Sequence, residues 1–186
     1  MKKLNKTLAL AGIMLIIIIT LTGCEFKLTD NPNRRIIEKK DVQGYTTYNH
    51  PSGVQFIYPE HWVDLGTISK PSFADQSTGT NVYLLIESLK GIYSLDSYTS
   101  ATMKNFKENL GNEIIGEISR EDVKLNGRNA SILSYTTKQD GENAILKLAC
   151  FIDDGKVYIL AVASEEKNYK DDKIIIDNII NSFVKK

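Results

Sequence analysis

Hydrophobic and polar residues alternate with a period of two in several stretches of the chain, which is the pattern of half-buried β-strands. Residues 45–49 and 54–58 flank the turn-forming cluster Pro51-Ser52-Gly53 and predict an opening hairpin. Pro59 follows the second strand and ends it, because proline has no amide hydrogen to donate to a sheet. Residues 81–88 are rich in branched and aromatic side chains and predict another strand.

The stretch 113–163 predicts a meander of antiparallel strands. Its turns are marked by Asn126-Gly127, a strong hairpin signal, and by Asp140-Gly141 and Asp153-Asp154-Gly155. In the strand expected over 143–152 both faces are mostly apolar. We therefore expect this strand in the centre of a sheet that is covered on two sides.

The apolar period changes to three and four residues in two places, which predicts two amphipathic helices. The first spans 94–110, with Ser94 as its N-cap and Gly111 as its stop. The second spans 168–184. Two such helices and an antiparallel sheet predict an α+β fold in which the helices pack on the sheet.

The first 24 residues decide the expected location of the protein. Lys2, Lys3 and Lys6 precede an apolar run over 8–19, which is the order of a secretory signal and is too short for a permanent membrane span. The run ends in Leu-Thr-Gly-Cys, which resembles the lipobox of bacterial lipoproteins and implies that Cys24 is acylated and becomes the first mature residue. The alternative is an uncleaved anchor with an incidental cysteine.

The chain then divides into a signal peptide over 1–23, a flexible tether over 24–44 that carries lipidated Cys24, and one domain over 45–186. The tether is polar and has too few apolar residues to form a core. Its pairs Arg34-Arg35 and Lys39-Lys40 either contact anionic headgroups or are simply solvated. The protein is expected at the extracytoplasmic face of a bacterial cell membrane.

Residues 53–62 read GVQFIYPEHW, an extended strand that runs into Tyr-Pro-x-x-Trp. This pattern resembles the opening of the PsbP-like family, and a helix, the 125–130 hairpin and a terminal helix follow in a similar order. The resemblance covers 45–186 and implies a PsbP-like α/β/α sandwich with an accessory or binding role. It implies no catalytic residues, and we expect no cofactor. The lipobox makes the chain more similar to the bacterial lipoproteins of the family than to its photosystem subunit.

The charge of the chain excludes one class of partner. Its 186 residues carry 23 basic and 23 acidic side chains, with no long basic block, so we expect no nucleic-acid binding. Removal of residues 1–23 takes away three lysines and leaves a mildly acidic mature protein. The expected partners are the membrane, through acylated Cys24, and a protein.

Candidate chemical groups are few. The two histidines, His50 and His61, are too few for a typical transition-metal site, although Glu60 and His61 could supply part of one, so no metal site is predicted. Cys150 lies in an apolar strand, where burial makes a thiol inert. No motif of a hydrolase or nucleotide-binding enzyme is present in the sequence, and we expect a protein that is not an enzyme.

The candidate binding face consists of Tyr58, His61, Trp62 and Phe73, next to an irregular loop over 64–80. Aromatic rings of this kind often anchor protein partners or line pockets, and they also pack sheets. The first hypothesis is therefore a membrane-anchored lipoprotein with a non-catalytic, protein-binding domain. The alternative is a small-ligand or metal-binding module that uses this face and loop, and a hydrolase remains as a contrast.

Overall fold

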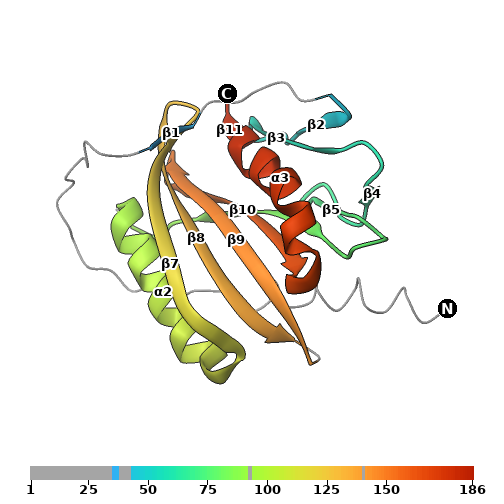
Figure 1. The fold of residues 1–186 in the computed structure, drawn as a ribbon. Helices are drawn as coiled ribbons and strands as arrows, with labels where there is room; N and C mark the ends of the chain where they lie inside the picture. Colours follow the sequence, from blue (N-terminus) through green and yellow to red (C-terminus); the bar gives the residue numbers. More distant parts are fainter. Residues whose placement is uncertain (1–34, 38–42, 92–93, 140) are drawn as a thin grey trace.

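The computed structural model describes residues 35–37, 43–91, 94–139 and 141–186. Within these residues the chain forms two sheets and two α-helices, shown in Figure 1. The helices are α2 (Leu95–Leu110) and α3 (Glu166–Ser182). The strands are β1 (Arg35–Ile37), β2 (Tyr45–Asn49), β3 (Val54–Pro59), β4 (Val63–Asp64), β5 (Ser72–Ala74), β6 (Asn81–Ser88), β7 (Ile114–Leu125), β8 (Arg128–Gln139), β9 (Glu142–Asp153), β10 (Lys156–Glu165) and β11 (Val184–Lys185).

Eight of the described strands form one sheet in the order β1-β7-β8-β9-β10-β6-β5-β4. Every neighbouring pair in it is antiparallel except β1 and β7, which are parallel. The long strands β7 to β10 follow one another as hairpins, as the turn signals predict. Strands β9 and β10 lie in the interior of this sheet, which confirms the prediction from their two apolar faces.

The large sheet separates two hydrophobic cores. On one face α2 contributes Tyr98 and Phe106 to the core. On the other face α3 and the three-stranded sheet β11-β3-β2 cover the strands, with Phe56 and Ile179 in that core. The fold is thus an α+β sandwich, as expected.

Helix α2 begins and ends where the sequence predicts. The Ser94 hydroxyl accepts a hydrogen bond from the Ser97 amide, and the amide of Gly111, which has a φ of +43°, bonds back to the Lys107 carbonyl. The tight turn between β7 and β8 is also confirmed, because Asn126 and Gly127 both have positive φ.

Three elements differ from the expectation. Helix α3 stops at Ser182, and residues 184–185 instead pair with β3. The segment 64–80, expected to be irregular, begins at the end of the short strand β4 and contains the short strand β5, both at the edge of the large sheet. Strand β1 lies within the stretch expected to be a tether, and it pairs with the last residues of β7.

No helix in the described ranges is long and apolar enough to cross a membrane. The expected signal peptide over 1–23 and the acylated Cys24 lie outside the described residues. Their assignment stays a prediction from the sequence.

Candidate functional site: a polar groove beside helix α3

The aromatic rings of the predicted binding face come together, but mostly inside the protein. The Tyr58 ring stacks on Phe73, with 3.9 Å between the ring centroids. Phe73 is 3% exposed and Trp62 is 5% exposed. These side chains fill the junction between β3 and the edge of the large sheet, where Tyr48 and Phe56 also contact Phe73.

Two polar groups of this aromatic cluster are shielded from water to different degrees, one fully and one partly. The indole nitrogen of Trp62 is buried and has no hydrogen-bond partner among the described residues. Burial raises the pKa of the Tyr58 phenol, and the charge of Asp64 raises it further. The Tyr58 phenol therefore stays protonated at neutral pH, and neither group is suited to act as a general acid or base.

His61 is the exposed member of the predicted face. Its Nε2 atom lies 3.3 Å from the Asp75 carboxylate. Burial of Asp75 opposes ionisation, but hydrogen bonds from Ser77 and His61 outweigh it and lower the pKa of Asp75. The described residues contain no group of three or more His, Cys, Asp or Glu side chains placed to hold a metal ion.

Cys150 lies on the other face of the sheet, in the core under α2. Burial raises the pKa of its thiol to about 12, and its Sγ donates to the Ser131 carbonyl at 3.4 Å. The thiol is therefore protonated and sterically protected, as the sequence predicts.

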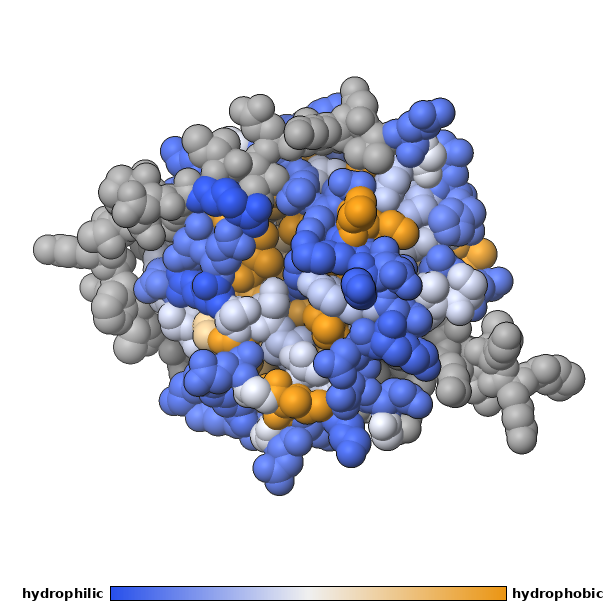
Figure 2. All heavy atoms as spheres, viewed as in Figure 1, coloured by the Kyte–Doolittle hydropathy of each residue, from blue (hydrophilic) through white to orange (hydrophobic). Residues whose placement is uncertain are grey.

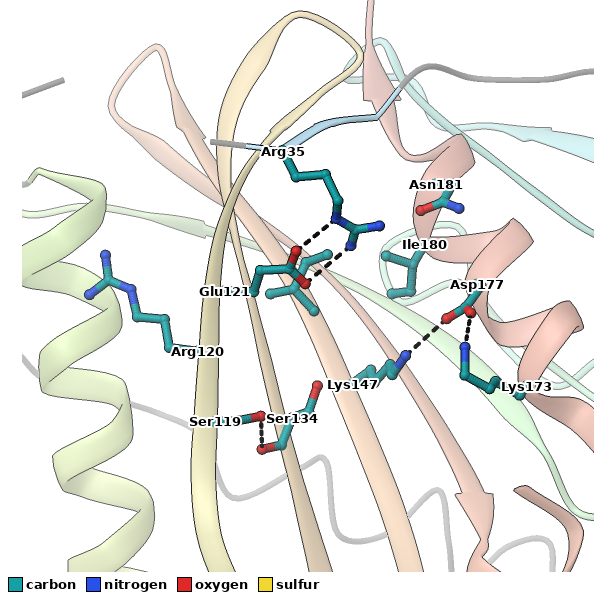
Figure 3. Close-up of a pocket in the computed structure, with 11 residues that line it drawn as sticks. Arg35, Ser119, Arg120, Glu121, Ser134, Lys147, Lys173, Asp177, Ile180 and Asn181 are labelled. Atoms are coloured by element: carbon teal, nitrogen blue, oxygen red, sulfur yellow. Dashed lines mark hydrogen bonds and ion pairs between the residues drawn. The ribbon is translucent and has the colours of Figure 1, made fainter. Parts of the chain in front are cut away.

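A second site, which sequence analysis did not identify, is a polar groove of about 330 Å³ between α3 and strands β1, β7, β8 and β9 (Figure 3). On this face of the molecule hydrophobic residues form small separate patches in a hydrophilic surface (Figure 2). The groove exists because α3 packs on β9, β10 and β3, so the sheet continues past the helix toward β7. Beyond the helix the strands carry polar side chains.

The floor of the groove contains a row of polar residues that strand register creates. Ser119 of β7 is opposite Ser134 of β8, and Ser134 is opposite Lys147 of β9. Residues directly opposite one another share a face, so all three lie on the groove side of the sheet. The Ser119 hydroxyl donates to the Ser134 carbonyl at 3.2 Å.

Two sets of ion pairs form the walls. On one side the Arg35 guanidinium donates two hydrogen bonds to the Glu121 carboxylate, at 2.7 and 3.1 Å. On the other side Lys147 and Lys173 both donate to Asp177 of α3, the former at 2.9 Å. In Figure 3 these groups face one another across the groove.

The electrostatics of the α3 wall hold its charges in place. Burial disfavours the charged form of Lys147, but the bond to Asp177 outweighs it and raises the pKa of Lys147. Burial acts against the carboxylate of Asp177 too, and the two lysines overcome it and lower the pKa of Asp177. Lys147 and Asp177 are thus both charged at neutral pH.

One sequence signal for this groove existed. Lys147 is the only charged residue between Asn143 and Ile152, a stretch otherwise suited to a buried strand. A lysine there needs a nearby carboxylate, and Asp177 supplies it from a distant part of the chain. The partner could not be identified from sequence because it depends on where α3 crosses the sheet.

Comparisons with known proteins agree with this architecture. A family model described as PsbP matches residues 43–184. No curated protein matches the sequence significantly.

Three solved structures show the same fold at low identity. Cyanobacterial PsbP (CyanoP) from Synechocystis is 15% identical with a TM-score of 0.58, covering 78% of this chain and 95% of that chain. LpqN of Mycobacterium tuberculosis, described as involved in cell envelope biogenesis, is 16% identical with a TM-score of 0.52, covering 75% and 89%. The Ran-binding protein Mog1p of Saccharomyces cerevisiae is 7% identical with a TM-score of 0.52, covering 75% and 94%.

Proposed function

The chain belongs to the PsbP family, and from this premise we propose that it is a membrane-anchored, extracytoplasmic lipoprotein whose domain acts as a non-catalytic accessory or protein-binding module. The observation that carries the binding-module part of the proposal is the family match over residues 43–184, which includes nearly the whole described domain. The anchoring part is supported by the Leu-Thr-Gly-Cys sequence that ends at Cys24. The acyl chains on Cys24 attach this domain to the membrane, and the segment after Cys24 gives it reach.

The binding role is supported by structural relatives and by the chemistry of the domain. Mog1p is described as Ran-binding and LpqN as involved in cell envelope biogenesis, and both share this fold. Within the domain the Cys150 thiol is buried and protonated, and the aromatic residues of the predicted face mainly pack the core. These features suit a domain that binds other molecules and does not catalyse a reaction on them.

The anchoring is tested by replacing Cys24. A Cys24→Ser variant lacks the sulfur that carries the acyl group, so the protein leaves the washed membrane fraction and its signal peptide is no longer removed before residue 24. Two or more acyl chains, at about 0.8 kcal/mol for each buried methylene, are needed for durable attachment. Fractionation with immunoblotting and mass spectrometry of the intact protein measures both effects.

Cys150→Ser is the matched control, because it removes the other cysteine of the chain at a buried site of the domain. Its membrane attachment stays that of the wild type. Unchanged attachment and processing in Cys24→Ser would disprove the lipoprotein assignment. Capture of the acylated protein from crosslinked membranes, with Cys24→Ser as the comparison, then identifies its protein partner.

The second candidate function, a small-ligand-binding lipoprotein, is favoured by one specific observation. The groove beside α3 has a volume at the lower end of the range of ligand pockets and is lined by hydroxyl, amide and charged groups. This function uses the groove rather than the face near Trp62.

A further inference from the structure

The charges of the groove do not cancel. Arg35 and Glu121 form one bidentate pair of opposite charges. On the facing wall a single carboxylate, Asp177, serves both Lys147 and Lys173. Among the described side chains that face into the groove, which exclude Arg120 because it pairs with Asp96 and Asp122, the positive charges therefore exceed the negative ones by one, at the two lysines.

Two hydrogen-bond donors beside this charge have no partner within the described part of the chain. The Ser134 hydroxyl lies in the floor between Ser119 and Lys147, and no described residue hydrogen-bonds to it through its side chain. The Asn181 side-chain amide lines the same groove and is also without a partner among the described residues. A ligand that only accepts hydrogen bonds satisfies both groups.

The side chains of Lys147 and Lys173 differ in how freely they can move, and this difference suits the binding and release of a ligand. The Lys147 side chain is 19% exposed and is held by Asp177, so it provides a fixed charge. The Lys173 side chain is 55% exposed and can turn from Asp177 toward a ligand. Arg120, although it borders the groove, points toward α2 in Figure 3, where it pairs with Asp96.

We propose that this groove binds a singly charged phosphate group, such as a phosphodiester, through Lys147, Lys173, Ser134 and Asn181. The ligand's one negative charge matches the excess charge, and its oxygens accept from the donors that lack partners. The inference rests on the proposed small-ligand function. The phosphate belongs either to a free solute or to a lipid headgroup.

The position of the groove makes both sources accessible. Arg35 on its wall follows the proposed lipid attachment site by 11 residues. Eleven extended residues span at most about 40 Å, so an anchored domain can reach the headgroups of its own membrane. The same groove is open to solutes.

Amine-reactive footprinting of the full acylated chain tests the proposal. Acetylation of Lys173 is followed by mass spectrometry in uncharged detergent, with and without dimethyl phosphate at constant ionic strength. The same measurement is made in nanodiscs of phosphatidylcholine, with and without phosphatidylglycerol. At twice the dissociation constant, the bound ligand slows acetylation of Lys173 about threefold.

Lys104 is the internal control, because it lies on α2, is 75% exposed and also pairs with a carboxylate four residues away. Its acetylation rate does not change. Ser134→Ala removes one hydroxyl with little change in shape, and it weakens binding roughly fivefold, so the slowing of Lys173 acetylation at the same ligand concentration falls from about threefold to about 1.4-fold. Circular dichroism confirms that this variant is folded.

The outcomes separate the two sources. Protection by dimethyl phosphate that Ser134→Ala weakens supports binding of a free phosphodiester. Protection only in nanodiscs, relative to detergent without ligand, supports a headgroup, because phosphatidylcholine and phosphatidylglycerol both carry a phosphodiester. No protection in either arm, equal protection of Lys104, or protection unaffected by Ser134→Ala overturns the proposal. The detergent arm does not depend on membrane attachment, so failure of the Cys24 assignment leaves its result interpretable.

Discussion

Some side chains whose residue type suggests a binding role at the surface instead pack the core of this protein. Trp62 is a good example, because tryptophan after a strand end is typical both of core packing and of binding sites. The structure buries it, along with Phe73, and leaves its indole nitrogen without an acceptor among the described residues. Sequence alone could not distinguish the two roles, because burial depends on the distant strands that close over the ring.

Substitutions at Trp62 test this packing role. Trp62→Ala removes a large buried ring, and we expect it to lower the free energy of unfolding by about 3–5 kcal/mol. Trp62→Phe keeps most of the ring and removes the buried nitrogen, so its cost stays below about 1.5 kcal/mol. Urea unfolding followed by circular dichroism measures both values.

Ile174→Ala is a suitable control, since its side chain is exposed on α3 and its loss changes stability by less than about 0.5 kcal/mol. A Trp62→Phe variant as unstable as Trp62→Ala would contradict the assignment. It would mean that the indole nitrogen has a partner that stabilises the fold.

At the scale of elements, the sequence predicts what local pattern determines. Helix α2 and the hairpin at Asn126 follow from a cap, an apolar stripe and a turn signal that all lie within a few residues. Strands β1, β4 and β5 are each only two or three residues long, too short to show a period. Strand β1 forms because it pairs with the distant strand β7, whereas β4 and β5 extend the edge of the large sheet next to β6 through pairings with nearby segments.

The hairpin between β7 and β8 also fixes the end of α3. The side-chain amide of Asn126 donates to the carbonyls of Asn181 and Phe183, at 2.9 and 3.0 Å. Both carbonyls lie where α3 ends, and helix ends leave such groups without intrahelical partners. One asparagine thus serves a turn and a helix terminus.

Asn126→Gly separates these two roles. Glycine tolerates the positive φ of Asn126 but lacks the amide, so we expect a loss of about 1–3 kcal/mol in the free energy of unfolding. Hydrogen exchange of the amides of β11 also becomes faster, because this strand follows the released helix end. Urea unfolding and exchange measured by mass spectrometry provide the two readouts.

The matched control is Asp154→Gly, which occupies a turn position with the same φ of 49° between β9 and β10. Its side chain forms an exposed ion pair with Lys185, so its loss costs less than about 1 kcal/mol. Equal losses for the two variants would show that backbone conformation alone, and not the contacts to α3, explains the effect of Asn126→Gly.

At the scale of the molecule, the eight-stranded sheet of the described residues organises both cores and the groove. Family membership accounts for this sheet and its two helices, and the sequence pattern predicts most of it. The groove is different, because it depends on the three-strand register of Ser119, Ser134 and Lys147 and on the position of α3. Register and helix placement are set by the whole fold, so its members lie far apart in the chain with no common motif.

The charged groups that hold these layers make stability depend on pH. The pKa values of Asp75, Asp153 and Asp177 are all lowered in the folded protein. For Asp153, hydrogen bonding from Lys185 is the largest cause, whereas in the other two hydrogen bonds overcome the effect of burial. A carboxylate with a lowered folded pKa stabilises the protein above its unfolded pKa, and this contribution is lost as the pH falls through the folded value.

The free energy of unfolding is therefore expected to be constant with respect to these three groups above about pH 5 and to decrease at lower pH. Asp177→Asn removes one of the groups, so it lowers stability at pH 7 and makes the decrease between pH 5 and pH 2 shallower. Ile174→Ala, at an exposed position of α3 without a titratable group, leaves the slope unchanged. Urea unfolding at a series of pH values measures these slopes. Parallel pH profiles of stability for Asp177→Asn and the wild type would show that Asp177 binds protons equally in the folded and unfolded states. That result would remove the electrostatic link between Asp177 of α3 and Lys147 of β9, and with it the ion pair that favours the charged form of Lys147 at the groove.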